Sequence, residues 1–415
     1  MFDVSPRQVH PTEPKLLFLA WDSPWPARWG GAVRTLGLLR ELSHAFDVEL
    51  LLLTREPLSD EQRAVLGEFS RRITRIPLRG VAGWDRLRTA WRSLTWGRPY
   101  HCSLVEASFH AHPDVLQRVL HFAGVVYASY GHWGTLVHGQ TAKNWIIDQQ
   151  HADADAWRVY VAQVSSPFVK AAASVNWRLA VRHFRHIYPG VGRVVSVCEE
   201  DGQLTLALAP TASVEVIENG VDCSYYAPDG RMKPGRRSVL FVGTASPRNM
   251  KALKRFVGQI LPLVRRSMPA VQMVVGGDFG PRAQAQFDGE RDIVFTGPVD
   301  DLRDAFNNSD VFVVPHADTH GSQLKVALAM AMGMAIVSTS EGVRGMPLVD
   351  GQSALIAADD EEFAARVVAL LNDAPRRARL GAAARQSALA RLDWPVLGKR
   401  LVKMVENVAL AAAVR

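Results

Sequence analysis

The segment SVLFVGTASPRNMKALKRFVGQILPLVRRSMPAVQMVVGG, residues 238–277, decides the fold class of this 415-residue chain. A short apolar run (238–242) is followed by a glycine, a segment with helical periodicity (250–267), a second apolar run (271–275) and two more glycines. Short apolar runs that alternate with amphipathic helices are typical of parallel strands covered by helices on both faces of a sheet. The segment therefore predicts a strand–helix–strand unit of an α/β fold.

The same alternation extends in both directions from this unit. It occupies residues 15–217 before the unit and continues through residues 293–372 after it. Between the two halves, YYAPDGRMKPGRR (residues 225–237) combines proline, glycine and charge, which indicates a linker. We therefore expect two doubly wound, Rossmann-like domains that face a cleft, one at residues 1–228 and the other at residues 229–392.

The overall composition narrows the class of protein. Hydrophobic residues make up 48% of the chain and charged residues 21%, which excludes a disordered or collagen-like chain. The cysteines Cys102, Cys198 and Cys223 are too few and too scattered for a disulfide framework or a zinc cluster, so we expect no metal site and a reducing compartment. No signal-peptide core is present, and no stretch approaches the ~20 apolar residues of a membrane span. A cytoplasmic protein is expected.

The net charge of +7 is concentrated in one segment. Between residues 71 and 98 the chain carries eight arginines against the single acid Asp85, interleaved with three tryptophans. Such a surface favours an anionic partner: lipid headgroups, nucleic acid or a phosphorylated substrate. We expect it to hold the protein peripherally on the inner face of the cell membrane. The residues expected in this contact are Arg86, Arg88, Trp91 and Arg92. The alternative is a solvated basic face whose tryptophans belong to the core.

The first candidate site for chemistry is FVGTASPRNMK, residues 241–251. Gly243 permits a sharp turn and a close approach of a ligand to the backbone. The helix that follows presents free N–H groups and the positive end of its dipole, to which Arg248 and Lys251 add charge suited to a diphosphate. In the alternative interpretation, Asn249 only caps the helix and the two cations are solvated.

The second candidate site is HGSQLKVALAMAMGMAIVST, residues 320–339. The helix is apolar on all sides after Lys325, which predicts that it is buried. A lysine near the N-terminus of a buried helix opposes the helix dipole and requires an anion. We expect a ligand phosphate, because the amides of Gly321, Ser322 and Gln323 lie at the same end. An internal carboxylate is the alternative.

Further candidates lie in the first half of the chain, each after an expected strand. Gly30 and Gly31 in ARWGGAVR form a flexible loop at a helix start. His151, among the acids of DQQHADADAW, is a candidate base or partner of a sugar hydroxyl, and His132 in SYGHWG is a second histidine of this kind. For each of them a purely structural role is the alternative.

In order and spacing, five segments resemble the family 4 retaining glycosyltransferases of the two-Rossmann-domain type (GT-B). They are the loop at residues 26–31, VIENGVD at 216–222, SVLFVG at 238–243, TGPVDDL at 296–302, and the stretch from VVPHAD to GVRG at 313–345. The resemblance covers nearly the whole chain and is strongest for members that build bacterial cell-surface or exported polysaccharide. Trp394 is similar in position to the start of the family's last helix, which implies a helix at residues 393–415 that crosses back to the N-terminal domain.

The resemblance implies transfer of a sugar from a nucleotide diphosphate sugar to a hydroxyl of a glycan or glycolipid, with retention at the anomeric carbon and without a metal or cofactor. It places the donor on the domain at residues 229–392 and the acceptor on the domain at residues 1–228. By position, Arg248 with Lys251 or Lys325 would neutralise the diphosphate. The other implied donor residues are Gly30, Gly31, Gly243, His320, Gly321, Ser322 and Gln323, and those implied for the sugar or acceptor are His151, Arg34 and His132.

Two positions depart from the family pattern. His320 and Leu328 stand where the family usually has two glutamates, one contacting the transferred sugar and the other the ribose. His320 is a candidate replacement for the sugar contact. The departure keeps a second class of function open, a non-catalytic relative that acts as a binding or scaffold protein. A glycosyltransferase that acts on nucleic acid is a third hypothesis. The leading one is an active glycosyltransferase with an acceptor near a membrane.

Overall fold

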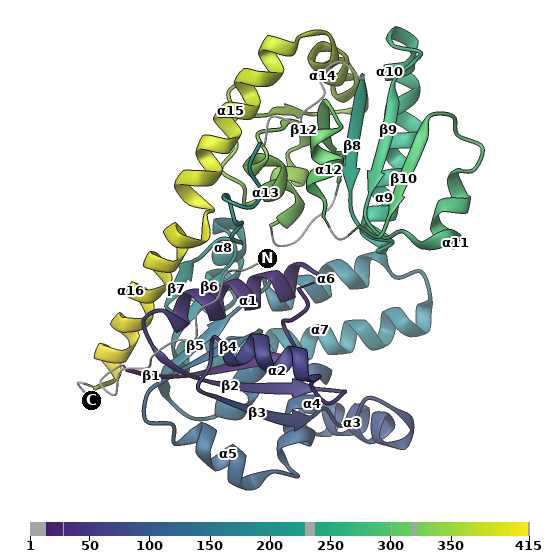
Figure 1. Cartoon of the computed structure of the whole chain (residues 1–415). Helices are drawn as coiled ribbons and strands as arrows, with labels where there is room; N and C mark the ends of the chain where they lie inside the picture. The colour runs from purple at the N-terminus through teal and green to yellow at the C-terminus, as the bar shows by residue number, and fades with distance from the viewer. Residues whose placement is uncertain (1–13, 28, 229–236, 300, 318–321, 414–415) are drawn as a thin grey trace. The chain divides into compact units, whose positions relative to one another are not determined.

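The protein consists of two compact units (Figure 1). The computed structural model describes residues 14–413, except residues 28, 229–236, 300 and 318–321. Unit 1 comprises Met1–Glu218 and Gly398–Arg415, and unit 2 comprises Asn219–Leu397. The division therefore lies after Glu218 and not after residue 228, and most of the expected linker lies outside the described residues.

Unit 1 is built on a parallel seven-stranded sheet with the order β3-β2-β1-β4-β5-β6-β7. Its strands are β1 (Lys15–Trp21), β2 (Asp47–Thr54), β3 (Arg72–Pro77), β4 (Val125–Ser129), β5 (Ala142–Asp148), β6 (Val191–Ser196) and β7 (Val214–Val216). The strand order reverses next to β1, which pairs with β2 on one side and β4 on the other. In open sheets of this kind, ligands bind beyond the carboxyl ends of the strands at the point of reversal.

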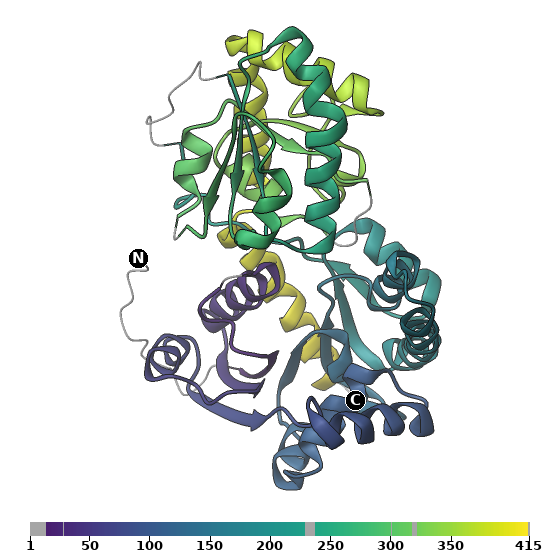
Figure 2. The same cartoon turned by 90° about the vertical axis from the view of Figure 1, so that its right-hand side faces the viewer.

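Helices cover both faces of this sheet (Figures 1 and 2). They are α1 (Gly30–Ser43), α2 (Asp60–Gly67), α3 (Gly83–Trp96), α4 (Tyr100–Phe109), α5 (Pro113–Leu120), the 3₁₀ helix η1 (Gly131–Val137), α6 (Asp153–Gln163), α7 (Pro167–Ile187) and α8 (Glu199–Leu208). Helix α7 begins at Pro167. Proline is favoured at the first position of a helix, where its missing N–H is no loss.

The inner strands of the sheet in unit 1, such as β1 and β2, are buried on both sides. Leu17 and Leu51 belong to an apolar cluster with side chains of α4, α5 and α7. The alternate residues Leu16 and Leu50 point to the other face and are also at most 1% exposed. This continuous burial explains why the strands read as uninterrupted apolar runs in the sequence.

Unit 2 repeats the architecture with a parallel six-stranded sheet in the order β10-β9-β8-β11-β12-β13. Its strands are β8 (Ser238–Val242), β9 (Gln272–Gly276), β10 (Ile293–Gly297), β11 (Val311–Val314), β12 (Ala335–Thr339) and β13 (Leu355–Ala357). Its α-helices are α9 (Pro247–Arg255), α10 (Leu261–Ser267), α11 (Gly280–Gln284), α12 (Arg303–Asn307), α13 (Leu324–Ala331), α14 (Asp360–Asn372) and α15 (Ala374–Arg391). Here the order reverses between β8 and β11.

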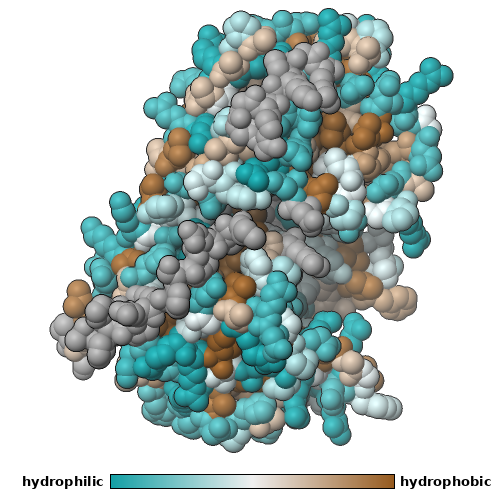
Figure 3. Space-filling model, viewed as in Figure 1, coloured by the Kyte–Doolittle hydropathy of each residue, from teal (hydrophilic) through white to brown (hydrophobic). Residues whose placement is uncertain are grey.

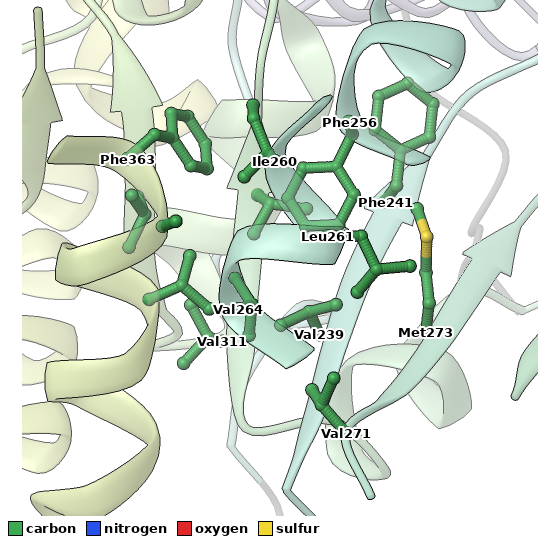
Figure 4. Close-up of a cluster of buried hydrophobic side chains, with 14 of the residues drawn as sticks. Val239, Phe241, Phe256, Ile260, Leu261, Val264, Val271, Met273, Val311 and Phe363 are labelled. Carbon is green, nitrogen blue, oxygen red and sulfur yellow. The ribbon is translucent and has the colours of Figure 1, made fainter. Parts of the chain in front are cut away.

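One face of the second sheet packs against α9, α10 and α14 (Figure 4). Val239 and Phe241 of β8 meet Phe256 and Ile260, which lie between α9 and α10, and Phe363 of α14. The members of this cluster are almost completely buried. The expected helix at residues 250–267 is present, with a π-helical turn (Phe256–Ile260) between α9 and α10. The expected alternation of strands and helices is thus confirmed in both units.

The C-terminal helix α16 (Trp394–Ala413) begins in unit 2 and ends in unit 1. At its start, the ring of Trp394 packs on the backbone of Gly220, where a Cβ atom would lie 2.5 Å from the indole. Further along, Arg400 forms an ion pair of 2.7 Å with Glu218. The predicted fold class, two Rossmann-like domains with a returning C-terminal helix, is confirmed.

Candidate functional site

The candidate site of unit 2 lies at the carboxyl ends of the adjacent strands β8 and β11, where the strand order reverses. Three segments meet there: the loop from Gly243 to Asn249, the residues that follow β11, and the first turn of α13. This is the location at which doubly wound sheets bind ligands.

Lys325 occupies the centre of this site. Its Nζ donates to Oδ1 of Asn249 at 2.8 Å, lies 3.2 Å from Nε2 of His316 and sits 5.0 Å from the ring centroid of Phe241. Within the described residues no carboxylate pairs with Lys325. The internal-carboxylate alternative is therefore not supported by these contacts, and the cation is held by neutral groups only.

The charges in the cluster formed by Lys325, His316 and Asn249 favour the binding of an anion. Burial, followed by the positive charge of Arg248, lowers the pKa of Lys325 from 10.5 to about 7. Burial and the charges of Lys325 and Arg248 lower the pKa of His316 to about 2, so its imidazole is neutral. An anion bound here would relieve the repulsion among these groups and stabilise the protonated lysine.

Two glycines allow Asn249 to reach this position. A Cβ atom on Gly243 would lie 2.8 Å from Nδ2 of Asn249, and one on Gly277 would lie 2.2 Å from the carbonyl oxygen of Gly243. Gly277 also has a φ of +105°. The helix cap is Ser246, whose hydroxyl accepts from the backbone N–H of Asn249. The alternative in which Asn249 caps the helix is therefore wrong.

A basic groove of about 660 Å³ runs along α9 beside this cluster. Arg248, Lys251, Lys254 and Arg255 line it, together with Pro315, and its described lining contains no acidic side chain. Such a surface concentrates anions. The structure thus brings Arg248, Lys251 and Lys325 to one region, as the sequence predicts.

The segment that precedes α13 is only partly described. His320 and Gly321 lie outside the described residues, whereas Ser322 accepts from Nδ2 of Asn219 at 2.8 Å and Gln323 is buried. Leu328 is 8% exposed and belongs to the apolar cluster around β11 and α13. It is therefore a core residue at the position where the resembled family places a ribose-binding glutamate.

Unit 1 carries an aromatic cluster at its own point of strand reversal. The ring centroid of His132 lies 4.4 Å from that of Trp21, 5.3 Å from that of Tyr130 and 6.1 Å from that of His101. His101 in turn lies 5.8 Å from Trp157. Sequence reasoning missed Trp21, His101 and Trp157, although Trp21 is the last residue of β1 and could have been noted on that ground.

His132 is a neutral group inside this cluster. Burial, with the nearby His101 and His151, lowers its pKa well below 6.5. Its Nε2 is buried and has no hydrogen-bond partner among the described atoms. His151 is half-buried between β5 and α6, so the structure brings the two predicted histidines together.

Asp153, in the first turn of α6, is a second unusual titrating group. Burial raises its pKa from 3.8 to about 7, although the hydroxyl of Tyr188 donates to it at 2.9 Å. The neighbouring carboxylates of Asp148 and Asp201 act in the same direction as burial. Burial and these two carboxylates thus favour the protonated form of Asp153.

The expected acceptor role of Arg34 is corrected by its position. Arg34 is 1% exposed, and its guanidinium donates to Asp148 and to the carbonyl oxygens of Ile217 and Glu218. All of these partners belong to the interior of unit 1, so Arg34 does not contact a membrane or an acceptor at the surface. It holds Ile217 and Glu218, the last residues of the segment Met1–Glu218 of unit 1, against the sheet.

The two glycines at the start of α1 differ in their surroundings. A Cβ atom on Gly31 would lie 2.3 Å from the hydroxyl of Tyr130, whereas one on Gly30 would meet nothing within 4 Å. The glycine at position 31 is thus explained by packing against Tyr130. The expected role of the two glycines in donor binding stays a prediction.

The arginine–tryptophan segment, residues 71–98, contains β3 and α3. Trp84, Trp91 and Trp96 are 81%, 68% and 52% exposed, so the alternative in which these tryptophans belong to the core is wrong. Arg86 and Arg88 are exposed as well, and Arg92 is half-buried.

Comparison with known proteins agrees with this description. Residues 236–373 match the family model of glycosyl transferases group 1. The phosphatidyl-myo-inositol mannosyltransferase of Mycolicibacterium smegmatis is 31% identical over 204 residues, which are 46% of this chain and 52% of that protein. The chain thus spans about half the length of the curated relatives it matches.

The fold is shared with solved structures over nearly the whole chain. Sucrose-phosphate synthase from Thermosynechococcus elongatus matches with a TM-score of 0.69 at 15% identity, covering 96% of this chain and 100% of that one. The Anabaena protein Alr3699/HepE, solved in complex with UDP, matches with a TM-score of 0.64 at 13% identity, covering 95% and 100%. The expected resemblance to glycosyltransferases of the GT-B fold is confirmed.

Proposed function

We propose, on the premise that residues 236–373 form a glycosyl transferases group 1 domain, that this chain transfers a sugar from a nucleoside diphosphate sugar to an acceptor hydroxyl. The observation that carries the proposal is Lys325, a buried amine that contacts Asn249 and His316 and lies near the positive charge of Arg248 at the strand reversal of unit 2. The proposal assigns the donor to unit 2 and includes retention at the anomeric carbon.

The chemistry requires stabilisation of a leaving group. When the bond between the anomeric carbon and the diphosphate oxygen breaks, its electron pair stays on that oxygen, and the acceptor hydroxyl oxygen forms the new bond and loses its proton. Fixed cations aimed at the oxygen stabilise the charge that develops in the transition state. In this proposal Lys325 and Arg248 fill this role together with Lys251, which lines the groove beside them. In this proposal they act without a metal or cofactor.

The proposal places the acceptor on unit 1, at the cluster around His132. Trp21 and Trp157 offer flat apolar faces to a sugar ring, and His132 and His151 offer hydrogen bonds to its hydroxyls. The relative from Mycolicibacterium smegmatis is named for an acceptor that is a lipid, phosphatidyl-myo-inositol. We therefore propose a glycan or glycolipid acceptor and a role in cell-surface glycan synthesis, at the cytoplasmic side of the membrane.

Calorimetric titration with UDP, GDP, ADP, CDP and dTDP tests the donor site. One nucleotide should bind to the native chain, and Lys325→Met and Arg248→Ala should each weaken that binding by about 1–3 kcal/mol, the range for hydrogen bonds to charged groups. The matched control is Arg266→Ala, an exposed arginine at the end of α10. Unchanged affinity in both site variants would place the diphosphate elsewhere.

A second function is favoured by one observation, the burial of Leu328 in the core. A non-catalytic relative that acts as a binding or scaffold protein would need no ribose contact at this position. To separate the two functions, the chain is incubated with sugar derivatives of the nucleotide that it binds and with a panel of glycan acceptors. Transfer to an acceptor supports the enzyme, and the anomeric proton coupling of the product tests retention. Binding without any product supports the scaffold function.

A further inference from the structure

We propose that helix α3 docks unit 1 on the surface of an anionic phospholipid bilayer, with its tryptophans at the level of the headgroups. This proposal goes beyond sugar transfer and does not depend on the donor site. The apolar side chains of α3 point outward: Trp84 is 81% exposed, Leu87 60%, Trp91 68% and Leu94 56%. Their spacing of three, four and three residues places them on one face of the helix.

The orientation of α3 is the reverse of an ordinary surface helix. Its inward face presents Thr89 and Ser93, which are 2% and 4% exposed and pack toward α4. A helix on the surface of a globular protein normally buries its apolar stripe and exposes its polar side. An apolar stripe that is exposed and rimmed by polar residues marks an interaction site.

The charges around the stripe identify the partner. Arg86 and Arg88 are exposed, the guanidinium of Arg92 lies 5.5 Å from the ring centroid of Trp96, and the single acid of the helix is Asp85. A helix with tryptophan and leucine on one side and arginine beside them is the kind that lies in the interface of an anionic bilayer.

Two other occupants fit the stripe less well. A second copy of this chain would bring the same arginines against each other, at a cost in like-charge repulsion. A nucleic acid would satisfy the arginines and could stack its bases on the tryptophans, but it offers nothing to Leu87 and Leu94, which lie between them. A bilayer accommodates the arginines, the tryptophans and the leucines together.

The position of α3 in unit 1 leaves the stripe accessible. Figures 1 and 2 show α3 at the periphery of the unit, on the side to which the hairpin of α6 and α7 also projects. Phe168, in the first turn of α7, is 88% exposed. In Figure 3 the region of α3, at the lower right, carries brown and pale side chains among the teal ones. Among the described residues, no helix combines the length and the apolarity needed to cross a bilayer.

The test is sedimentation of the full-length protein with vesicles of phosphatidylcholine alone and of phosphatidylcholine mixed with phosphatidylglycerol, at low and high salt. Three exposed-residue variants are compared with the native chain: Trp84→Ser combined with Trp91→Ser, Arg86→Gln combined with Arg88→Gln, and the apolar control Leu410→Ser, whose leucine is 67% exposed on α16. Far-ultraviolet circular dichroism verifies that each variant is folded.

We expect the native protein and the Leu410 control to bind the mixed vesicles and to prefer them to phosphatidylcholine. The tryptophan variant should bind at least about tenfold more weakly in both salt conditions, because insertion is lost. The arginine variant should lose the preference for phosphatidylglycerol and the dependence on salt. Binding of the nucleotide that the native chain recognises should be unchanged in all three variants, which separates a failure of docking from a failure of the donor site.

Three results would overturn the proposal. The first is equal vesicle binding by the tryptophan variant and the native chain. The second is a concentration-dependent dimer, seen by analytical ultracentrifugation, that the tryptophan variant abolishes. The third is tight, steeply salt-dependent binding to single-stranded polynucleotide with no preference for the mixed vesicles.

Discussion

Arg34 and Asp148, which are 114 residues apart in the sequence, form an ion pair in the interior of unit 1 with N–O distances of 3.0 and 2.5 Å. Neither side chain is accessible to solvent. The remaining donors of Arg34 reach the carbonyl oxygens of Ile217 and Glu218, 2.9 and 3.0 Å away, so that one arginine links α1, β5 and the end of the first segment of unit 1.

Replacement of Arg34 by methionine should lower the free energy of unfolding of the protein by about 3–5 kcal/mol, because the carboxylate of Asp148 would be left buried without its counter-charge. Urea unfolding followed by circular dichroism measures the change. The control is Arg40→Met, on the same helix, whose ion pair with Glu41 is partly exposed and should contribute less than about 1 kcal/mol. Equal effects of the two substitutions would contradict the interior role of Arg34.

The affinity for a nucleoside diphosphate should depend on pH through Lys325. Its pKa in the free protein is about 7, so below that pH the ammonium is charged and ready to bind an anion. Above pH 7, binding must first protonate the amine, and the affinity should fall by up to about tenfold for each pH unit. Calorimetry across this range measures the slope, and Lys325→Met should remove it. A slope that persists in the variant would assign the dependence to another group.

Gly277→Ala should disturb the loop that positions Asn249. The new Cβ would approach the carbonyl oxygen of Gly243 to 2.2 Å at a φ of +105°, where a side chain is strained. We expect a loss of unfolding free energy of about 1–3 kcal/mol together with weaker nucleotide binding. Gly258→Ala is the matched control, because a Cβ there meets nothing within 4 Å. Comparable losses in the two variants would argue against a specific role of the glycine pair.

The free energy of unfolding of unit 1 should decrease as the pH rises, because of Asp153. Its pKa is raised from 3.8 to about 7, so between these values the folded protein binds more protons than the unfolded chain. Stability is therefore lost as the pH rises through this range, by at most about 4 kcal/mol at about 1.4 kcal/mol per pKa unit. Asp153→Asn, which cannot ionise, should be the more stable protein at pH 8 and lose this advantage near pH 4. Parallel stability profiles of the two proteins would show that Asp153 does not titrate in this window.

The fold class follows from the sequence because parallel strands buried on both faces must be apolar along their whole length, and the segments between them must be amphipathic. The alternation around residues 238–277 therefore predicts both units. Lys325 was also identifiable, since a lysine at the start of an otherwise apolar helix needs a specific environment. Strand β3 was missed because it is an edge strand that is only partly buried. Its polar and charged residues, among them Arg72 and Arg75, leave no continuous apolar run.

The sequence by itself determined the two alternating α/β halves, the cations near one expected phosphate site and the basic, tryptophan-rich segment. Only the tertiary structure decided what these side chains contact. It placed Asn249 and His316 on Lys325, buried Arg34 on Asp148 and turned the tryptophans of α3 outward. The physical reason is that periodicity fixes which residues share a face of a helix or strand, whereas the packing of segments distant in sequence fixes what that face meets.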